Sequence, residues 1–134
     1  MIKTLDLLGA RDPRHVVEPA GQSLSDGALI VLPADTSYVS AALASNAGAV
    51  SRLVQNAAGE VVTTLVFGST SAAREYLPEL TSLQNRLVKR CWPGPVVLCF
   101  SREAGDFPER ARSIAEAGAS LNFFVPESPL TRDL

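Results

Sequence analysis

Histidine and cysteine are scarce in this sequence of 134 residues, which contains one histidine and two cysteines. Because His15 lies far along the chain from any other candidate site, Ser-His-Asp and Cys-His catalysis have no imidazole to use. The spacing of Cys91 and Cys99 matches no zinc-ligand pattern and no disulfide framework. We interpret both cysteines as reduced, buried packing residues and His15 as a solvated residue in the first turn of a helix.

Long apolar runs and a strong excess of one charge are also absent. No segment reaches the roughly 18 consecutive apolar residues of a membrane-spanning helix, and the first residues do not follow the plan of a signal peptide. Twelve basic and 14 acidic residues give a net charge of −2, so no global positive field attracts nucleic acid. We expect a soluble, cytoplasmic protein with no membrane partner.

The residues that are present suit one compact domain with a single core. A hydrophobic content of 46% is enough to build that core, and we assign residues 1–134 to a single domain. Apolar runs at residues 28–32, 61–67, 96–100 and 121–125 predict strands. The first run is wholly apolar, which predicts a strand buried on both faces.

Helix signals lie between these runs. Asp12 and Pro13 predict the start of a helix that ends near Gly27, with a kink or a restart at Pro19. Asn46 predicts the N-cap of a second helix, which Gly59 would end, and residues 69–76 read as a third. The alternation of strands and helices favours an α/β or α+β layer arrangement.

A capping box marks the next helix, because Thr81 is followed three residues later by Gln84. We expect this helix to turn its apolar stripe to the core and its basic residues outward. The stripe comprises Leu83, Leu87, Val88 and Cys91, and the outer side carries Arg86, Lys89 and Arg90. Trp92-Pro93-Gly94-Pro95 then predicts a sharp turn, with Trp92 as a packing anchor. Residues 106–118 are expected to form a polar helix or loop, and residues 126–129 a turn toward another helix.

Two motifs of this chain are distinctive: residues 33–38 read Pro-Ala-Asp-Thr-Ser-Tyr, and residues 92–95 read Trp-Pro-Gly-Pro. They resemble the Pro-Thr-Asp/Glu-Thr-x-Tyr segment and the Trp-Pro-Gly-Pro turn of the YrdC-like family, the threonylcarbamoyl-AMP synthases. The resemblance extends from about residue 12 to the end and covers roughly two thirds of a family domain. It implies a twisted mixed sheet flanked by helices, of the α+β class, that lacks the family's C-terminal third.

The resemblance also implies a set of ligands. The family joins L-threonine, bicarbonate and ATP, the last with Mg²⁺, into threonylcarbamoyl-AMP, an intermediate of tRNA modification. Asp35, Thr36 and Tyr38 keep the family's motif residues, and Ser120 stands where the family often has a threonine hydroxyl. These four residues are the candidate substrate-binding residues, and we assign no catalytic residue and no metal ligand.

Several other family positions hold residues of a different kind here. The Lys-x-Arg element falls on residues 56–60, Asn-Ala-Ala-Gly-Glu, where an acidic side chain would repel a triphosphate. The family's Ser-Ala-Asn segment has no counterpart before Leu134. The motif threonine, the motif glycine, the strand-end histidine, the late arginine and the late histidine correspond to Ala34, Val39, Gly68, Phe124 and Ser128, in that order.

These replacements favour a catalytically inactive YrdC-like domain that acts as a binding or interaction module. In this interpretation Asp35 and Thr36 satisfy the backbone of a tight turn, and Tyr38 packs against the sheet. The alternative is an active synthase, using ATP and L-threonine, that a longer chain or a partner completes. A protein partner or a second copy of the chain would then cover the incomplete sheet.

Binding of double-stranded RNA is a third hypothesis, which the resemblance suggests. The family binds RNA through a basic concave surface, whereas this chain has few basic residues near the expected face. A run of charge on a helix is usually a solvated face, so we expect weak binding at most. The residues concerned are Arg52, Arg74, Arg86, Lys89, Arg90, Arg110 and Arg112.

Overall fold

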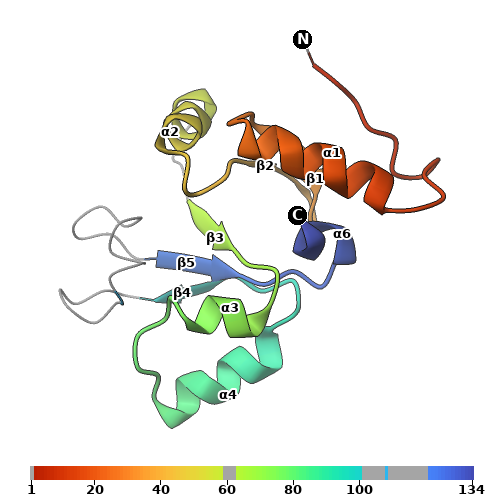
Figure 1. The fold of residues 1–134 in the computed structure, drawn as a ribbon. Coiled ribbons are helices and arrows are strands. Elements are labelled where there is room, and N and C mark those ends of the chain that lie inside the picture. The colour runs from red at the N-terminus through yellow and green to blue at the C-terminus, as the bar shows by residue number, and fades with distance from the viewer. Residues whose placement is uncertain (1, 59–62, 101–107, 109–120) are drawn as a thin grey trace.

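Two small β-sheets and the helices beside them make up the computed structural model, which describes residues 2–58, 63–100, 108 and 121–134 (Figure 1). Strand β1 (Ile30–Pro33) pairs antiparallel with β2 (Tyr38–Ala41). In the other sheet β5 (Leu121–Phe124) is central, parallel to β3 (Thr64–Val66) and antiparallel to β4 (Leu98–Phe100). This mixed sheet with flanking helices confirms the α+β fold class.

Helix α1 (Arg14–Ser25) runs without interruption through Pro19, so the helix does not begin again after Glu18. Proline has the backbone φ of a helix, and at this position it removes one hydrogen bond without ending the element. The Asp12 carboxylate accepts a hydrogen bond from the Arg14 N–H at 3.0 Å, and the exposed His15 lies in the first turn, as predicted. Gly27 follows the helix with φ +83°, a conformation that favours glycine, which confirms the predicted stop.

Strand β1 is not buried on both faces, contrary to the sequence prediction. Leu32 is buried, but 69% of the Val31 side chain is exposed. The reason is that β1 pairs with β2 in a two-stranded sheet, and successive side chains of a strand point to opposite faces. Only one face of this pair is covered well enough to bury a side chain, and the continuous apolar run could not indicate which face that is.

The core lies between the three-stranded sheet and the helices α3 (Thr70–Arg74) and α4 (Ser82–Cys91), which Figure 1 shows on one side of that sheet. Phe123, at the centre of β5, is fully buried and stacks near Phe67 and edge-on to Phe100, with ring centroids 5.9 and 5.6 Å apart. Trp92 is 4% exposed, and its indole N–H donates to the Val96 carbonyl at 2.8 Å. The predicted packing role of Trp92 is confirmed.

The start of α4 is as predicted, because Thr81 and Gln84 form the capping box. The predicted core stripe is only partly right: Val88 is fully buried, whereas Leu83 is 58% exposed and Leu87 46% exposed. Val88 belongs to the core cluster, and Leu87 and Leu83 lie about 100° and 140° around the helix axis from it. Cys99 on β4 is likewise exposed and Cys91 only half-buried, so neither cysteine is the buried residue we expected.

The remaining helices begin where the sequence places them. Asn46 caps α2 (Ala47–Asn56) by accepting from the Ala49 N–H at 3.0 Å, and Ser69 caps α3 in the same way. Helix α6 (Pro129–Asp133) confirms the turn toward another helix near the C-terminus. Helix α2 ends at Asn56, before the predicted stop at residue 59. The helix or loop predicted at residues 106–118 lies outside the described residues, residue 108 excepted. Within the described residues, none of the helices has the length and apolar character needed to cross a membrane.

Candidate functional site

Three segments far apart in the sequence meet around the 33–38 motif. They are the loop between β1 and β2, Gly68, which lies two residues after β3, and the segment of α6 with the turn before it (Figure 1). Within the loop, the Ala34 N–H donates to the Ser37 carbonyl at 2.7 Å, so the motif closes as a tight turn. We call these three segments together the motif cluster.

Asp35 is the residue that joins the loop to the C-terminal turn. Its two carboxylate oxygens accept hydrogen bonds from the backbone N–H groups of Glu127 at 2.8 Å and Ser128 at 3.0 Å. Both amides lie before the first turn of α6, where N–H groups lack a helical partner. The carboxylate therefore has a structural role, as expected, but it accepts from distant backbone N–H groups and not from those of its own turn.

The first turns of α6 add two further bonds to the motif cluster. The hydroxyl of Thr131, a residue only 9% exposed, donates to the Pro33 carbonyl at 3.1 Å. The Nε–H of Arg132 donates to the Gly68 carbonyl, also at 3.1 Å. The sequence analysis missed both residues, because neither occupies a motif position and only the fold brings α6 to the loop.

Gly68, at the position that corresponds to the family's histidine, has no room for a side chain. A Cβ atom there would lie 2.6 Å from the Arg132 carbonyl oxygen, which belongs to the backbone and has little freedom to move. The histidine-to-glycine replacement and the close approach of α6 are therefore consistent with each other. An imidazole could enter this position only if α6 shifted.

The other candidate residues take no part in these contacts. Thr36 is exposed, and Tyr38 is 76% exposed. The idea that Tyr38 packs against the sheet is wrong, because residue 38 lies on the uncovered face of β2. Ser120 lies outside the described residues. The structure thus brings Asp35 together with the backbone of Ser128, and it joins Gly68 to α6, the helix that Ser128 precedes. Thr36 and Tyr38 face solvent.

Two of the basic residues considered for RNA binding bond other groups of the chain. The Arg52 guanidinium donates to the Gly27 carbonyl, and Arg74 Nη1 donates to Asn85 Oδ1 at 2.9 Å. Arg86, Lys89 and Arg90 are exposed on α4, away from the motif loop (Figure 1). Arg110 and Arg112 lie outside the described residues. Among the described cations, Arg132 is the one whose side chain contacts the motif cluster, through its hydrogen bond to the Gly68 carbonyl.

The motif cluster does not fit the Mg²⁺ that accompanies ATP in the family. Both Asp35 oxygens already accept backbone amides, and the described residues contain no group of three His, Cys, Asp or Glu residues that could hold a metal ion. Protein carboxylates and phosphate oxygens bind Mg²⁺ in near-octahedral geometry, and here the Asp35 carboxylate is turned toward two backbone N–H groups. We therefore assign no metal ligand here.

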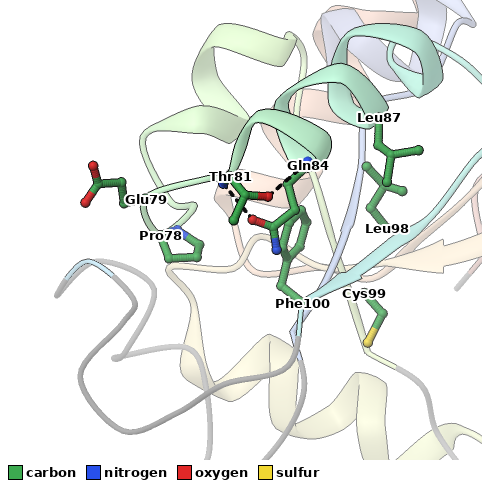
Figure 2. Close-up of a pocket in the computed structure, with 8 residues that line it drawn as sticks. All are labelled: Pro78, Glu79, Thr81, Gln84, Leu87, Leu98, Cys99 and Phe100. Carbon is green, nitrogen blue, oxygen red and sulfur yellow. Dashed lines mark hydrogen bonds between the residues drawn. The ribbon is translucent and has the colours of Figure 1, made fainter.

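A separate hollow of about 660 Å³ lies beside α4 and β4 (Figure 2). Thr81 and Gln84 line it with the two side chains that form the capping box, and Leu87, Leu98 and Phe100 form its apolar part. The remaining lining residues are Pro78, Glu79 and Cys99. None of the motif residues lines this hollow.

Comparison with known proteins identifies the same family as the motifs. The model of the Sua5, YciO and YrdC family, which carries the description "telomere recombination", matches residues 22–134. A search of curated protein sequences gives no match.

Solved structures with a similar fold include two of Sua5 from P. abyssi. The crystal structure of that protein complexed with L-threonine superposes with a TM-score of 0.70 at 20% identity, over 92% of this chain and 36% of that chain. A double variant of the same protein gives 0.74 at 19% identity, over 99% and 38%. The present chain therefore spans little more than a third of the solved chains it resembles.

Proposed function

Because the chain belongs to the Sua5, YciO and YrdC family, we propose that it is a YrdC-like domain that acts as an interaction module and does not itself synthesise threonylcarbamoyl-AMP. The proposal concerns the 134 residues of this chain. One observation carries it: the motif carboxylate of Asp35 is used to hold the backbone of residues 127 and 128. These two bonds give the carboxylate a structural role and use about two of its four acceptor positions.

The distribution of charge supports the same proposal. Synthesis of an acyl-adenylate needs cations that hold the triphosphate and stabilise charge as pyrophosphate leaves. Arg52 and Arg74 bond groups on neighbouring elements, and the exposed cations of α4 lie away from the motif loop. The Gly68 position, closed by Arg132, offers no imidazole. These arrangements support a domain that keeps the family fold and lacks the groups that the family's reaction needs.

The decisive test is release of pyrophosphate from ATP in the presence of L-threonine and bicarbonate. We expect none above the rate without protein, and no heat of binding for ATP or L-threonine in isothermal titration. Release that requires both L-threonine and bicarbonate would refute the proposal.

A Thr36→Val variant is the matched control for any release that is observed. Thr36 is exposed and bonds nothing in the motif cluster, so its replacement should leave folding unchanged. Genuine family chemistry at the motif would fall in this variant, whereas a contaminating ATPase would not. The two outcomes separate a working site from an impurity.

A second candidate is a synthase that a longer chain or a partner completes. The observation behind it is the coverage of the solved relatives, of which this chain spans 36% and 38%. In that case the segment that supplies the missing ligands should restore release of pyrophosphate when it is joined to, or mixed with, this chain. The relative crystallised with L-threonine would serve as the positive control for that assay.

A further inference from the structure

Helix α4 presents apolar side chains that the described part of the chain leaves exposed. Leu83 is 58% exposed and Leu87 is 46% exposed, one turn apart. Residues 83, 86, 87 and 90 share one side of a helix, so Arg86 and Arg90 flank the two leucines. We call these four residues the α4 face. Exposed leucines that adjoin a hollow mark a site of contact more often than isolated surface leucines do.

The hollow continues the α4 face onto the sheet. Leu87 lines it together with Leu98 and the buried Phe100, and Figure 2 shows Leu87 and Leu98 next to each other. With about 660 Å³, it is large enough to accept a bulky apolar side chain from another molecule. In the described residues β4 is also an outer strand of its sheet, so this side of the molecule presents both an apolar depression and a strand edge.

Charge is arranged along this surface with opposite signs at its two ends. Glu79, exposed, lies at one end of the hollow just before the capping box. Lys89 and Arg90, also exposed, lie in the last turn of α4, at the other end. A surface with acid at one end, leucines in the middle and base at the other is complementary to itself when it is turned by 180°.

We propose that the α4 face and the adjoining hollow form the interface of a homodimer with two-fold symmetry. In a two-fold contact, the same patch of both copies meets, and a residue pair occurs twice. Antiparallel α4 helices place Leu83 and Leu87 of one copy against those of the other and against the hollow. Glu79 of each copy then lies near Arg90 of its partner. A parallel arrangement would oppose like charges at both ends.

This inference does not depend on whether the chain has synthase activity. Figure 1 places α4 at the opposite end of the molecule from the β1–β2 pair that carries Asp35. Dimerisation through α4 would leave the motif cluster accessible. An assay of pyrophosphate release and a measurement of mass therefore test separate statements, and either can fail without the other.

Sedimentation equilibrium of the full chain is the first test. We expect a monomer–dimer equilibrium in the micromolar range, and a Leu83→Asp variant should be monomeric at concentrations where the unaltered chain is a dimer. Leu8→Asp is the matched control, because Leu8 is 99% exposed and lies outside the α4 face. A chain that is monomeric at every concentration overturns the proposal, as does a dimer that Leu83→Asp leaves intact.

Charge reversal tests the antiparallel pairing itself. Glu79→Arg and Arg90→Glu should each weaken the dimer about tenfold, because each places like charges together twice. An equimolar mixture of the two single variants should recover association, since both pairs of like charge in either homodimer become pairs of opposite charge in the heterodimer. Thermal unfolding of each variant checks that the fold is kept. Failure of the mixture to associate better than either variant alone would refute this interface, even if a dimer persisted through another surface.

Discussion

Asp35 keeps a residue of the family motif, but its contacts are those of a structural residue. The Asp35 carboxylate accepts hydrogen bonds from two backbone amides that lie 92 and 93 positions further along the chain. Thr36 and Tyr38, its neighbours in the motif, face solvent. Asp35 therefore has a structural role in this fold.

Replacement of Asp35 by alanine should lower the free energy of unfolding by about 1–3 kcal/mol, because two backbone amides lose a charged acceptor. Urea denaturation followed by circular dichroism measures this change. Asp35→Asn should cost less, since the amide oxygen still accepts one bond. Thr36→Ala, at an exposed position, is the control and should change stability by less than about 0.5 kcal/mol. Equal stability of Asp35→Ala and Thr36→Ala would show that the two bonds contribute nothing.

Gly68 allows a second prediction at this scale. A Gly68→Ala variant should be less stable by about 1–3 kcal/mol, because its Cβ would lie 2.6 Å from the Arg132 carbonyl oxygen and force α6 to move. Thermal unfolding measures the difference. Gly21→Ala is the matched control, since no atom lies within 4 Å of a Cβ at that helical position. Alanine there should be neutral or stabilising.

Among the elements, α4 combines a well-defined start with an incompletely covered surface. Its capping box satisfies two backbone groups within the first turn, and Val88 anchors it to the core. Leu83 and Leu87 contribute little to that anchoring because they remain exposed. The stability of α4 within one chain therefore depends on its cap and on one row of side chains.

Loss of the cap should consequently be measurable. Thr81→Ala should reduce the free energy of unfolding by about 1 kcal/mol, because the Gln84 N–H loses its acceptor. Ser82→Ala, one residue further on and inside the helix, serves as the control and should have a smaller effect. If the two variants unfold at the same urea concentration, the capping box does not stabilise α4 in solution.

Across the whole molecule, the two sheets are joined near the C-terminus by the contacts of α6. Asp35 and Pro33 belong to the β1–β2 pair and its loop, and Gly68 follows β3 of the other sheet. The bonds from residues 127, 128, 131 and 132 reach both. The segment around α6 thus connects elements that are formed much earlier in the chain.

The distribution of cations over the molecule leads to a prediction about RNA. The exposed cations of α4 number three, so the logarithm of any affinity for double-stranded RNA should fall with the logarithm of salt concentration with a slope of about −3 or shallower. Fluorescence anisotropy with a labelled duplex at several salt concentrations measures the slope. Lys89→Ala should reduce the slope by about one, and Arg74→Ala should not, because Arg74 bonds Asn85. A much steeper slope would mean that other cations contact the RNA.

Local signals in the sequence determined where most described elements begin or end. Asn46, Ser69 and the pair Thr81 and Gln84 act on backbone groups within three residues, and Gly27 supplies a conformation that side chains disfavour. Interactions of such short range are encoded where they occur. The two family motifs, likewise contiguous in the sequence, were enough to indicate the family and its fold.

Only the tertiary structure decided which apolar residues are covered and what Asp35 bonds. An apolar run specifies that a segment seeks burial, but the exposure of Val31, Leu83 and Leu87 depends on how many neighbours the fold brings to each face. The partners of Asp35 and Gly68 are 92 and 64 residues away, beyond the reach of any local pattern. The sequence therefore determined the family and the caps, and the packing of α6 determined which groups Asp35 and Gly68 bond.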